Sequence, residues 1–130
     1  MVSAVFSLAA CSKKKDECKA LYELAGEHRK KYKKELDSDD ADKSATRTRV
    51  VKALKDATDE LSDAKVSAPK AKKARDQYVE DLDTMRTMLD DSVSEEKQEK
   101  AKAKLETQNS DADYFAIGVA CEDMSIVDEF

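Results

Sequence analysis

The sequence has few residues that interrupt helices and few large aromatic side chains. Its 130 residues include two glycines, one proline, no tryptophan and only 5% aromatic residues. Glycine and proline mark turns and loops in most domains, so their scarcity favours helices joined by short connections. A chain of this length fits one domain, because domains of roughly 100–200 residues are usual. We therefore expect a single all-α domain.

Charged residues make up 41% of the chain, and the formal net charge is −5. High charge with few aromatic residues is typical of disordered chains. Here, however, apolar residues recur at the spacing of a helical face, which favours folded helices. We expect no nucleic-acid partner, because contacts to phosphates need a basic surface.

Residue patterns that carry catalysis or bind metals are also scarce. His28 is the only histidine, which excludes the paired Glu-x-x-His motifs of di-iron bundles and the His-Glu-x-x-His motif of zinc proteases. We interpret His28 as a half-buried structural residue on an inward face. The aspartates between residues 37 and 42 lack the central glycine and closing glutamate of an EF-hand calcium loop. We therefore predict a protein that is not an enzyme and has no metal or cofactor.

Apolar residues recur at three- and four-residue steps in four segments of the chain. This spacing predicts helices over 14–37, about 42–66, about 69–91 and about 93–121. The residues expected to face inward are Cys18, Leu21, Tyr22, Ala25, His28, Tyr32, Leu36, Val50, Leu54, Ala57, Leu61, Ala64, Ala71, Ala74, Tyr78, Leu82, Met85, Leu89, Ala101, Leu105, Ala112, Phe115 and Val119.

The connections between these segments indicate how the helices are arranged. Pro69 suits the first turn of the third helix, and Ser92 with Glu95 has the spacing of a capping box at the start of the fourth. Four helices of similar length with short turns favour an antiparallel up-down-up-down four-helix bundle. The alternative is a three-helix bundle or coiled coil in which the third and fourth helices are continuous.

The N-terminus carries a recognisable short motif. Leu8-Ala9-Ala10-Cys11 follows an apolar stretch and resembles the lipobox of bacterial lipoproteins. The resemblance implies cleavage before Cys11, lipidation of its sulfur and anchoring in the cell envelope, with Ser12 implying transfer to the outer membrane. The apolar stretch is too short to span a bilayer, which needs about 20 apolar residues.

This resemblance divides the chain into four parts. We expect a short or truncated lipoprotein signal segment at 1–10, a tether at 11–16, the helical bundle at 17–121 and an acidic C-terminal tail at 122–130. The lysines within the tether would be solvated, or each would add about 1 kcal/mol of attraction to an anionic membrane surface.

The three cysteines fit this division, because a lipid on Cys11 leaves Cys18 and Cys121 as a pair. In an antiparallel four-helix bundle the start of the first helix and the end of the fourth lie at the same end. We therefore predict a disulfide between Cys18 and Cys121 in an oxidising compartment. The alternative is two buried free thiols that pack as small apolar residues.

Three functions remain open at this point. The first is a small cell-envelope lipoprotein, held at the membrane by its lipid, that acts as a non-enzymatic interaction or structural module with an unknown protein partner. The second is a helical bundle that binds an apolar small molecule between its helices, in a cavity on the order of several hundred Å³ lined by Tyr22, Tyr32, Tyr78 and Phe115. The third is a cytoplasmic coiled-coil adaptor.

Overall fold

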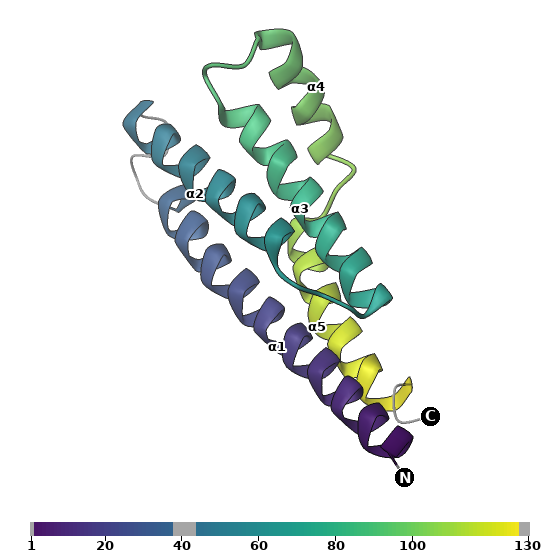
Figure 1. Ribbon diagram of the computed structural model, residues 1–130. Coiled ribbons are helices and arrows are strands. Elements are labelled where there is room, and N and C mark those ends of the chain that lie inside the picture. The colour runs from purple at the N-terminus through teal and green to yellow at the C-terminus, as the bar shows by residue number, and fades with distance from the viewer. Residues whose placement is uncertain (1, 38–43, 128–130) are drawn as a thin grey trace.

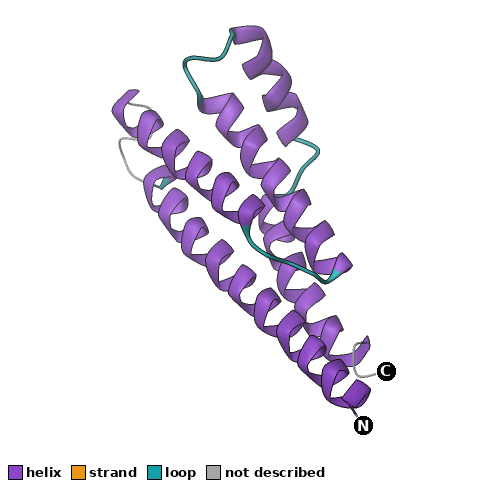
Figure 2. Ribbon diagram, viewed as in Figure 1, coloured by secondary structure: helices purple, strands orange, loops and turns teal. Residues whose placement is uncertain are grey.

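The structure, a computed structural model, describes residues 2–37 and 44–127, with side chains for 13–37 and 44–122. These residues form helices and no strands (Figures 1 and 2), so the prediction of an all-α chain is confirmed. The helices are α1 (Val2–Leu36), α2 (Ser44–Asp63), α3 (Pro69–Leu89), α4 (Glu95–Leu105) and α5 (Ser110–Val127).

The helices pack as a bundle in which α3 has the most neighbours. Helix α1 packs against α2 and α5, and α3 packs against α2, α4 and α5. Helix α4 lies beside the C-terminal part of α3, whereas α5 lies farther down the bundle (Figure 1). The first turns of α1 and the last turns of α5 lie at the same end of the molecule.

The core is built from the stripes predicted on the first three helices, joined by Ile117 of α5. Alanines in the stripes, such as Ala25 and Ala57, are fully buried and let the helices approach closely. Burial of the larger side chains stabilises the fold by about 25 cal/mol for each Å² of apolar surface removed from water. The central cluster consists of Leu21, Ala25, Tyr32, Val50, Leu54, Ala57, Leu61, Tyr78, Leu82 and Ile117.

Helix α2 ends without a glycine, and a buried arginine of α3 caps it instead. Arg75 is 6% exposed, and its Nη1 donates hydrogen bonds to the carbonyl oxygens of Leu61, Ser62 and Ala64 at 3.1, 3.4 and 3.0 Å. The last carbonyls of a helix have no partner inside the helix. Arg75 therefore completes the C-terminus of α2 and fixes α3 against it.

The fourth predicted helix is wrong as a single element, because the chain breaks between α4 and α5. The Asn109 side chain accepts a hydrogen bond from the Ala112 backbone N–H at 3.0 Å, which caps a new helix in the usual way. Asp111 and Asp113 lie in its first turn, where the helix dipole favours negative charge.

The break also changes which face of α5 points inward. We predicted Ala112, Phe115 and Val119 in the core, but all three are exposed. Ile117 and Ala120 are buried in their place. We predicted the inward-facing residues of α5 by continuing the three- and four-residue spacing of α4. That spacing no longer marks the inward face, because the non-helical residues between the two helices rotate α5 relative to α4.

The third and fourth predicted helices are not continuous either, so the alternative with one long helix is wrong. Helix α3 ends at Leu89, and α4 begins after Ser94, whose side chain accepts a hydrogen bond from the Lys97 N–H at 3.4 Å. The expected capping box is therefore displaced. Ser92 donates instead to Asp90 Oδ1, from its hydroxyl at 2.6 Å and its N–H at 2.9 Å.

The ends of the chain are more helical than we expected. Helix α1 begins at Val2 and passes through the predicted tether, while α5 continues to Val127 and includes most of the predicted acidic tail. The functional division at Cys11 remains a prediction. Within the part of the chain that the structure describes, no helix combines the length and the apolar character needed to cross a membrane.

Candidate functional site

A disulfide joins the middle of α1 to the C-terminal half of α5. Cys18 is bonded to Cys121, with their Cα atoms 5.7 Å apart, as predicted. Cys18 is 1% exposed and lies in a small cluster with Ala68 and Ala71. The Cys11 side chain lies outside the described residues, so its lipidation is considered below as a proposal.

All four tyrosines gather with Phe115 in a chain of rings that runs from the core to the surface. The hydroxyls of Tyr32 and Tyr78 hydrogen-bond at 2.7 Å in the core. The Tyr114 ring lies 5.8 Å from that of Tyr78, 5.0 Å from Tyr22 and 5.1 Å from Phe115. Burial raises the pKa of both Tyr32 and Tyr78, so their hydroxyls stay protonated at neutral pH.

This arrangement does not form the ligand cavity that we considered from the sequence. Tyr32 and Tyr78 are at most 1% exposed and bond to each other, so they line no open space. Tyr22 and Phe115 instead line a groove of about 540 Å³ on the outside of the molecule, between α1 and α5. The other residues that line the groove are Lys15, Lys19, Gly118, Val119, Cys121 and Glu122.

The two helices on either side of this groove approach closely because each has a glycine opposite a tyrosine of the other. A Cβ atom on Gly118 would lie 2.9 Å from Cζ of Tyr22, and one on Gly26 would lie 3.0 Å from the Tyr114 hydroxyl. Real Cβ atoms essentially never approach another heavy atom more closely than 3.0 Å. The two glycines therefore make room for the two tyrosine rings.

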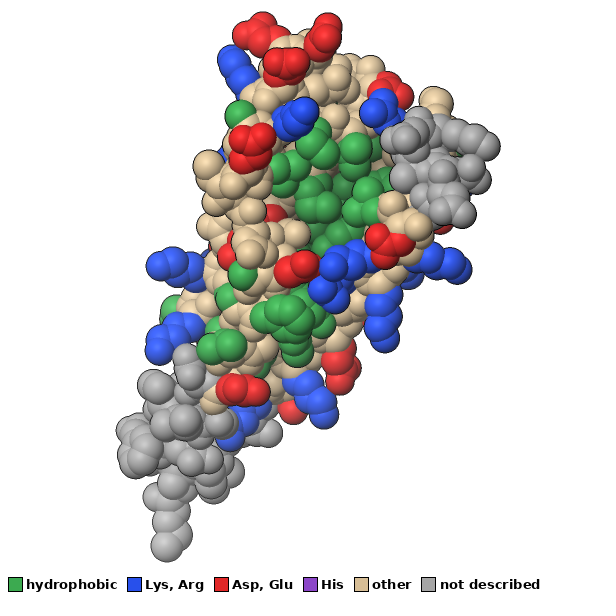
Figure 3. Space-filling view, turned by 180° about the vertical axis from the view of Figure 1, so that it is seen from behind, with side chains coloured by type: hydrophobic (Ala, Val, Ile, Leu, Met, Phe, Trp, Pro, Cys, Tyr) green, Lys and Arg blue, Asp and Glu red, His purple; other side chains and the backbone are tan. Residues whose placement is uncertain are grey.

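The outer side of α5 exposes large apolar side chains. Phe115 and Val119 are 52% and 55% exposed and are the large hydrophobic residues classed as exposed among those described. The guanidinium of Arg29 lies 4.9 Å from the Tyr114 ring centroid and 5.6 Å from that of Phe115, within the range of cation–π attraction. The face in Figure 3 shows hydrophobic side chains reaching the surface between charged ones.

Basic side chains of α1 also bind the first turn of α5. Arg29 Nη2 and Lys33 Nζ each lie 3.0 Å from Asp111 Oδ1. Hydrogen bonds from Lys33 and then Arg29 lower the pKa of the Asp111 carboxyl. With Lys15 and Lys19 at the groove, the charged residues that α1 presents to α5 in these contacts are all basic.

A second polar site lies in the interior, where α3 meets α5. Asp81 is 0% exposed. One of its oxygens accepts a hydrogen bond from Gln77 Nε2 at 3.2 Å, while Oδ2 accepts none from an N–H or a hydroxyl. Burial and then the facing Asp113 carboxyl raise the pKa of Asp81 to about 7.

His28 faces inward as predicted, and it is fully rather than half buried at 4% exposure. It donates its Nε2–H to the Glu60 carboxylate of α2, which joins α1 to α2. Of the aspartates between residues 37 and 42, those after Asp37 lie outside the described residues. Among the residues that the structure describes, no group of three or more His, Cys, Asp or Glu side chains is placed to hold a metal.

Comparison with known proteins adds no relative to these observations. No protein-family model matches the sequence, and neither the curated proteins nor the solved structures include a match to the chain.

Proposed function

We propose that the protein is a lipid-anchored helical module of the bacterial cell envelope. In this proposal Cys11 carries the lipid and becomes the N-terminus, and the helical domain acts by binding rather than by catalysis, with a protein partner that the sequence does not name. The observation that supports it is the pairing of Cys18 with Cys121. Disulfides persist in oxidising compartments, and this pair accounts for every cysteine except Cys11.

The geometry of α1 is compatible with this anchor. Cys11 and Cys18 lie on the same helix, and a rise of about 1.5 Å per residue separates them by about 10 Å along its axis. The disulfide-bonded end of the bundle would therefore face the membrane. The end that carries the α3–α4 connection lies at the far end of the molecule (Figure 1) and would be the part most distant from the lipid.

We also infer that α4 and α5 together take the place of one broken fourth helix in an up-down-up-down bundle. Helix α3 packs against both of them, and α5 packs against α1 as well as α3. These contacts support a ring of four positions, with the fourth divided by the break at 106–109.

Metabolic labelling tests the anchor. The gene, expressed in a bacterium that has the lipoprotein pathway, should yield a protein that incorporates an alkyne-bearing fatty acid and fractionates with membranes. The Cys11→Ser variant should lose both properties. A matched control, Cys18→Ser with Cys121→Ser, removes the disulfide pair and should keep the label. An unlabelled protein with an unmodified Met1 would contradict the proposal.

A further inference from the structure

The groove between α1 and α5 combines exposed apolar side chains with a basic edge. We call the surface formed by Lys15, Lys19, Tyr22, Phe115 and Val119 the α1–α5 face. These residues line one groove of about 540 Å³, and its two outermost apolar side chains are more than half exposed. Exposed apolar surface of this kind marks interaction sites when it is contiguous and rimmed by polar residues.

The apolar part of the face is held in place from several sides. Phe115 and Val119 lie one helical turn apart on α5, so they project in the same direction. The Phe115 ring contacts the Tyr114 ring and the Arg29 guanidinium. The disulfide at Cys121 fixes the following turn of α5 to α1. This support keeps both side chains in the exposed position instead of letting them fold inward.

The described charged residues that line the groove are two basic and one acidic, which leaves its α1 edge locally basic. The chain as a whole has a net charge of −5, yet Lys15 and Lys19 border the groove on α1 and Glu122 is the acidic residue that lines it. Farther along the same edge, Arg29 and Lys33 are both paired with Asp111 of α5, so the attraction to a partner rests on the two lysines at the groove. Lysine side chains can lay their methylene stems on apolar surface while the ammonium groups reach anionic headgroups.

We propose that the α1–α5 face docks on an anionic phospholipid bilayer. Phe115, Val119 and the edge of Tyr22 enter the interface between headgroups and acyl chains, and Lys15 and Lys19 contact the phosphates. Peripheral membrane binding of this type scales with buried apolar area and with attraction to anionic lipids. A second copy of the chain fits less well as the partner, because its identical face would carry the same two lysines and the like charges would repel each other.

The docking is independent of a lipid on Cys11 and can be measured without it. The test uses the full chain with Cys11→Ser and vesicles of phosphatidylcholine, alone or mixed with phosphatidylglycerol. We expect binding to the mixed vesicles that weakens as salt is added, because surface attraction is screened. Failure of the fatty-acid labelling described above would leave this measurement unaffected.

Two pairs of substitutions separate the apolar contribution from the basic one. Phe115→Ser with Val119→Ser should weaken vesicle binding about tenfold or more, because one buried side chain of this size is worth a factor of that order. Lys15→Glu with Lys19→Glu should weaken it by a similar factor, since each lysine adds about 1 kcal/mol near the membrane. Circular dichroism should show that the helices are retained.

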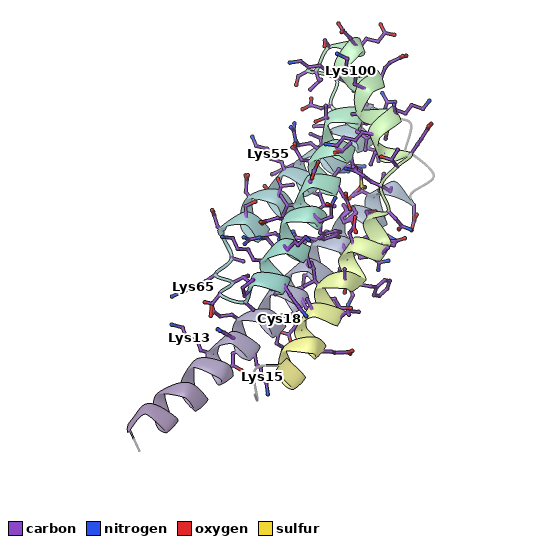
Figure 4. All side chains as sticks on the ribbon, turned by 90° about the vertical axis from the view of Figure 1, so that its right-hand side faces the viewer. Lys13, Lys15, Cys18, Lys55, Lys65 and Lys100 are labelled. Carbon is purple, nitrogen blue, oxygen red and sulfur yellow. A yellow bond between two sulfur atoms is a disulfide. The ribbon has the colours of Figure 1, made fainter. Side chains whose placement is uncertain are left out.

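A control with the same charge change lies on a helix that does not pack against α5. Lys52 and Lys55 of α2 are exposed, and Figure 4 shows Lys55 well away from Lys15 and Cys18. Lys52→Glu with Lys55→Glu should leave vesicle binding within about twofold of the parent, because distant surface charges are screened.

A direct readout of insertion uses the absence of tryptophan from the chain. With Phe115→Trp, the new indole should shift its emission to the blue and be quenched by brominated acyl chains when anionic vesicles are added. With Ala45→Trp, placed at an exposed site on α2, it should do neither.

Three results would overturn the docking proposal. The first is equal or absent binding to neutral and anionic vesicles. The second is an unchanged affinity in the Phe115→Ser, Val119→Ser variant. The third is a concentration-dependent dimer, seen by light scattering, that the same two substitutions dissociate, because the face would then belong to a second copy of the chain.

Discussion

The ring of Tyr22 lies against the backbone of Gly118, so close that a methyl group at residue 118 would stand 2.9 Å from the ring carbon Cζ. Tyr114 packs less tightly against Gly26, because a methyl group at residue 26 would have the Tyr114 hydroxyl oxygen, at 3.0 Å, as its nearest neighbour. The two positions therefore make a matched pair for testing how tightly α1 and α5 pack.

We predict that Gly118→Ala destabilises the protein relative to Gly26→Ala. Alanine favours a helix over glycine by about 1 kcal/mol at either position. At residue 118 the added methyl group must displace a stacked aromatic ring, and overpacking of this kind costs about 1–3 kcal/mol. Denaturant unfolding of the two variants should give a lower free energy for Gly118→Ala, by about 1–2 kcal/mol. Equal stabilities would show that the Tyr22 ring moves away freely.

The buried Asp81 should make stability depend on pH. Its pKa is raised to about 7 in the folded protein, whereas an unfolded aspartate titrates near its ordinary value of about 3.9. The folded state therefore binds more protons between these two values, and stability falls as pH rises through that window. Above about pH 7 the buried Asp81 must be accommodated as a charge beside Asp113.

Asp81→Asn should remove this loss, because the amide can donate to Asp113 at any pH. The variant should match or slightly trail the parent at about pH 4, and it should exceed the parent by about 3–4 kcal/mol at about pH 8. Thermal melts across this range measure the difference. Asp59→Asn, an exposed aspartate on α2, is the control and should give a difference that does not change with pH.

Replacement of Arg75 by methionine should destabilise the protein by about 2–4 kcal/mol, because buried carbonyl groups left without donors are costly. Arg75 bonds three carbonyl oxygens at the end of α2, and methionine retains only the length of the side chain. The comparison is Arg47→Met, which removes an exposed ion pair with Asp91 and should change stability by less than about 1 kcal/mol. Urea unfolding distinguishes the two variants, and similar losses would contradict a capping role for Arg75.

Reduction of the disulfide should lower stability by about 4–5 kcal/mol if the loss of chain entropy dominates, since the bond closes a loop on the order of 100 residues. The oxidised and reduced proteins should therefore differ in their urea midpoints. The Cys18→Ser, Cys121→Ser variant should melt like the reduced parent, and reductant should leave it unchanged. A reductant-sensitive melt in that variant would mean that another thiol is responsible.

The first three helices, apart from the start of α1, could be predicted from the sequence because their apolar stripes are long and most of their ends are marked. Pro69 begins α3 as expected, and Leu54, Leu61 and Leu82 are fully buried as their spacing predicts. The disulfide followed from the same reasoning, since the packing of α5 against α1 requires both chain ends to meet.

The inward-facing residues of the C-terminal third could not be predicted, because a short break in the helix changes which face of the following residues points inward. Residues 106–109 separate α4 from α5, and only Asn109 carried a signal, as a residue typical of helix N-caps. Once the phase was wrong, Phe115 was placed in the core and Ile117 was overlooked. The α1–α5 face could not be found from the sequence for the same reason.

The remaining features of the candidate site depend on contacts between different helices, which the spacing within one helix does not reveal. Tyr32 and Tyr78 are buried as their stripes predict, but the alternative in which they line a ligand cavity did not anticipate that their hydroxyls bond each other, a pairing that depends on the relative rotation of α1 and α3. Asp81 lies one residue from the predicted stripe position Leu82, and its burial depends on the approach of α5. Sequence spacing within one helix contains neither piece of information.

The bond between Cys18 and Cys121 also determines how the domain would carry a mechanical load. The two sulfurs connect the middle of α1 directly to the C-terminal half of α5, and α2, α3 and α4 all lie inside the covalent loop that this bond closes. A pull applied between the two ends of the chain would pass through the disulfide and bypass that loop. The helices inside it would feel no tension, and the domain would keep its fold under forces that extend its termini.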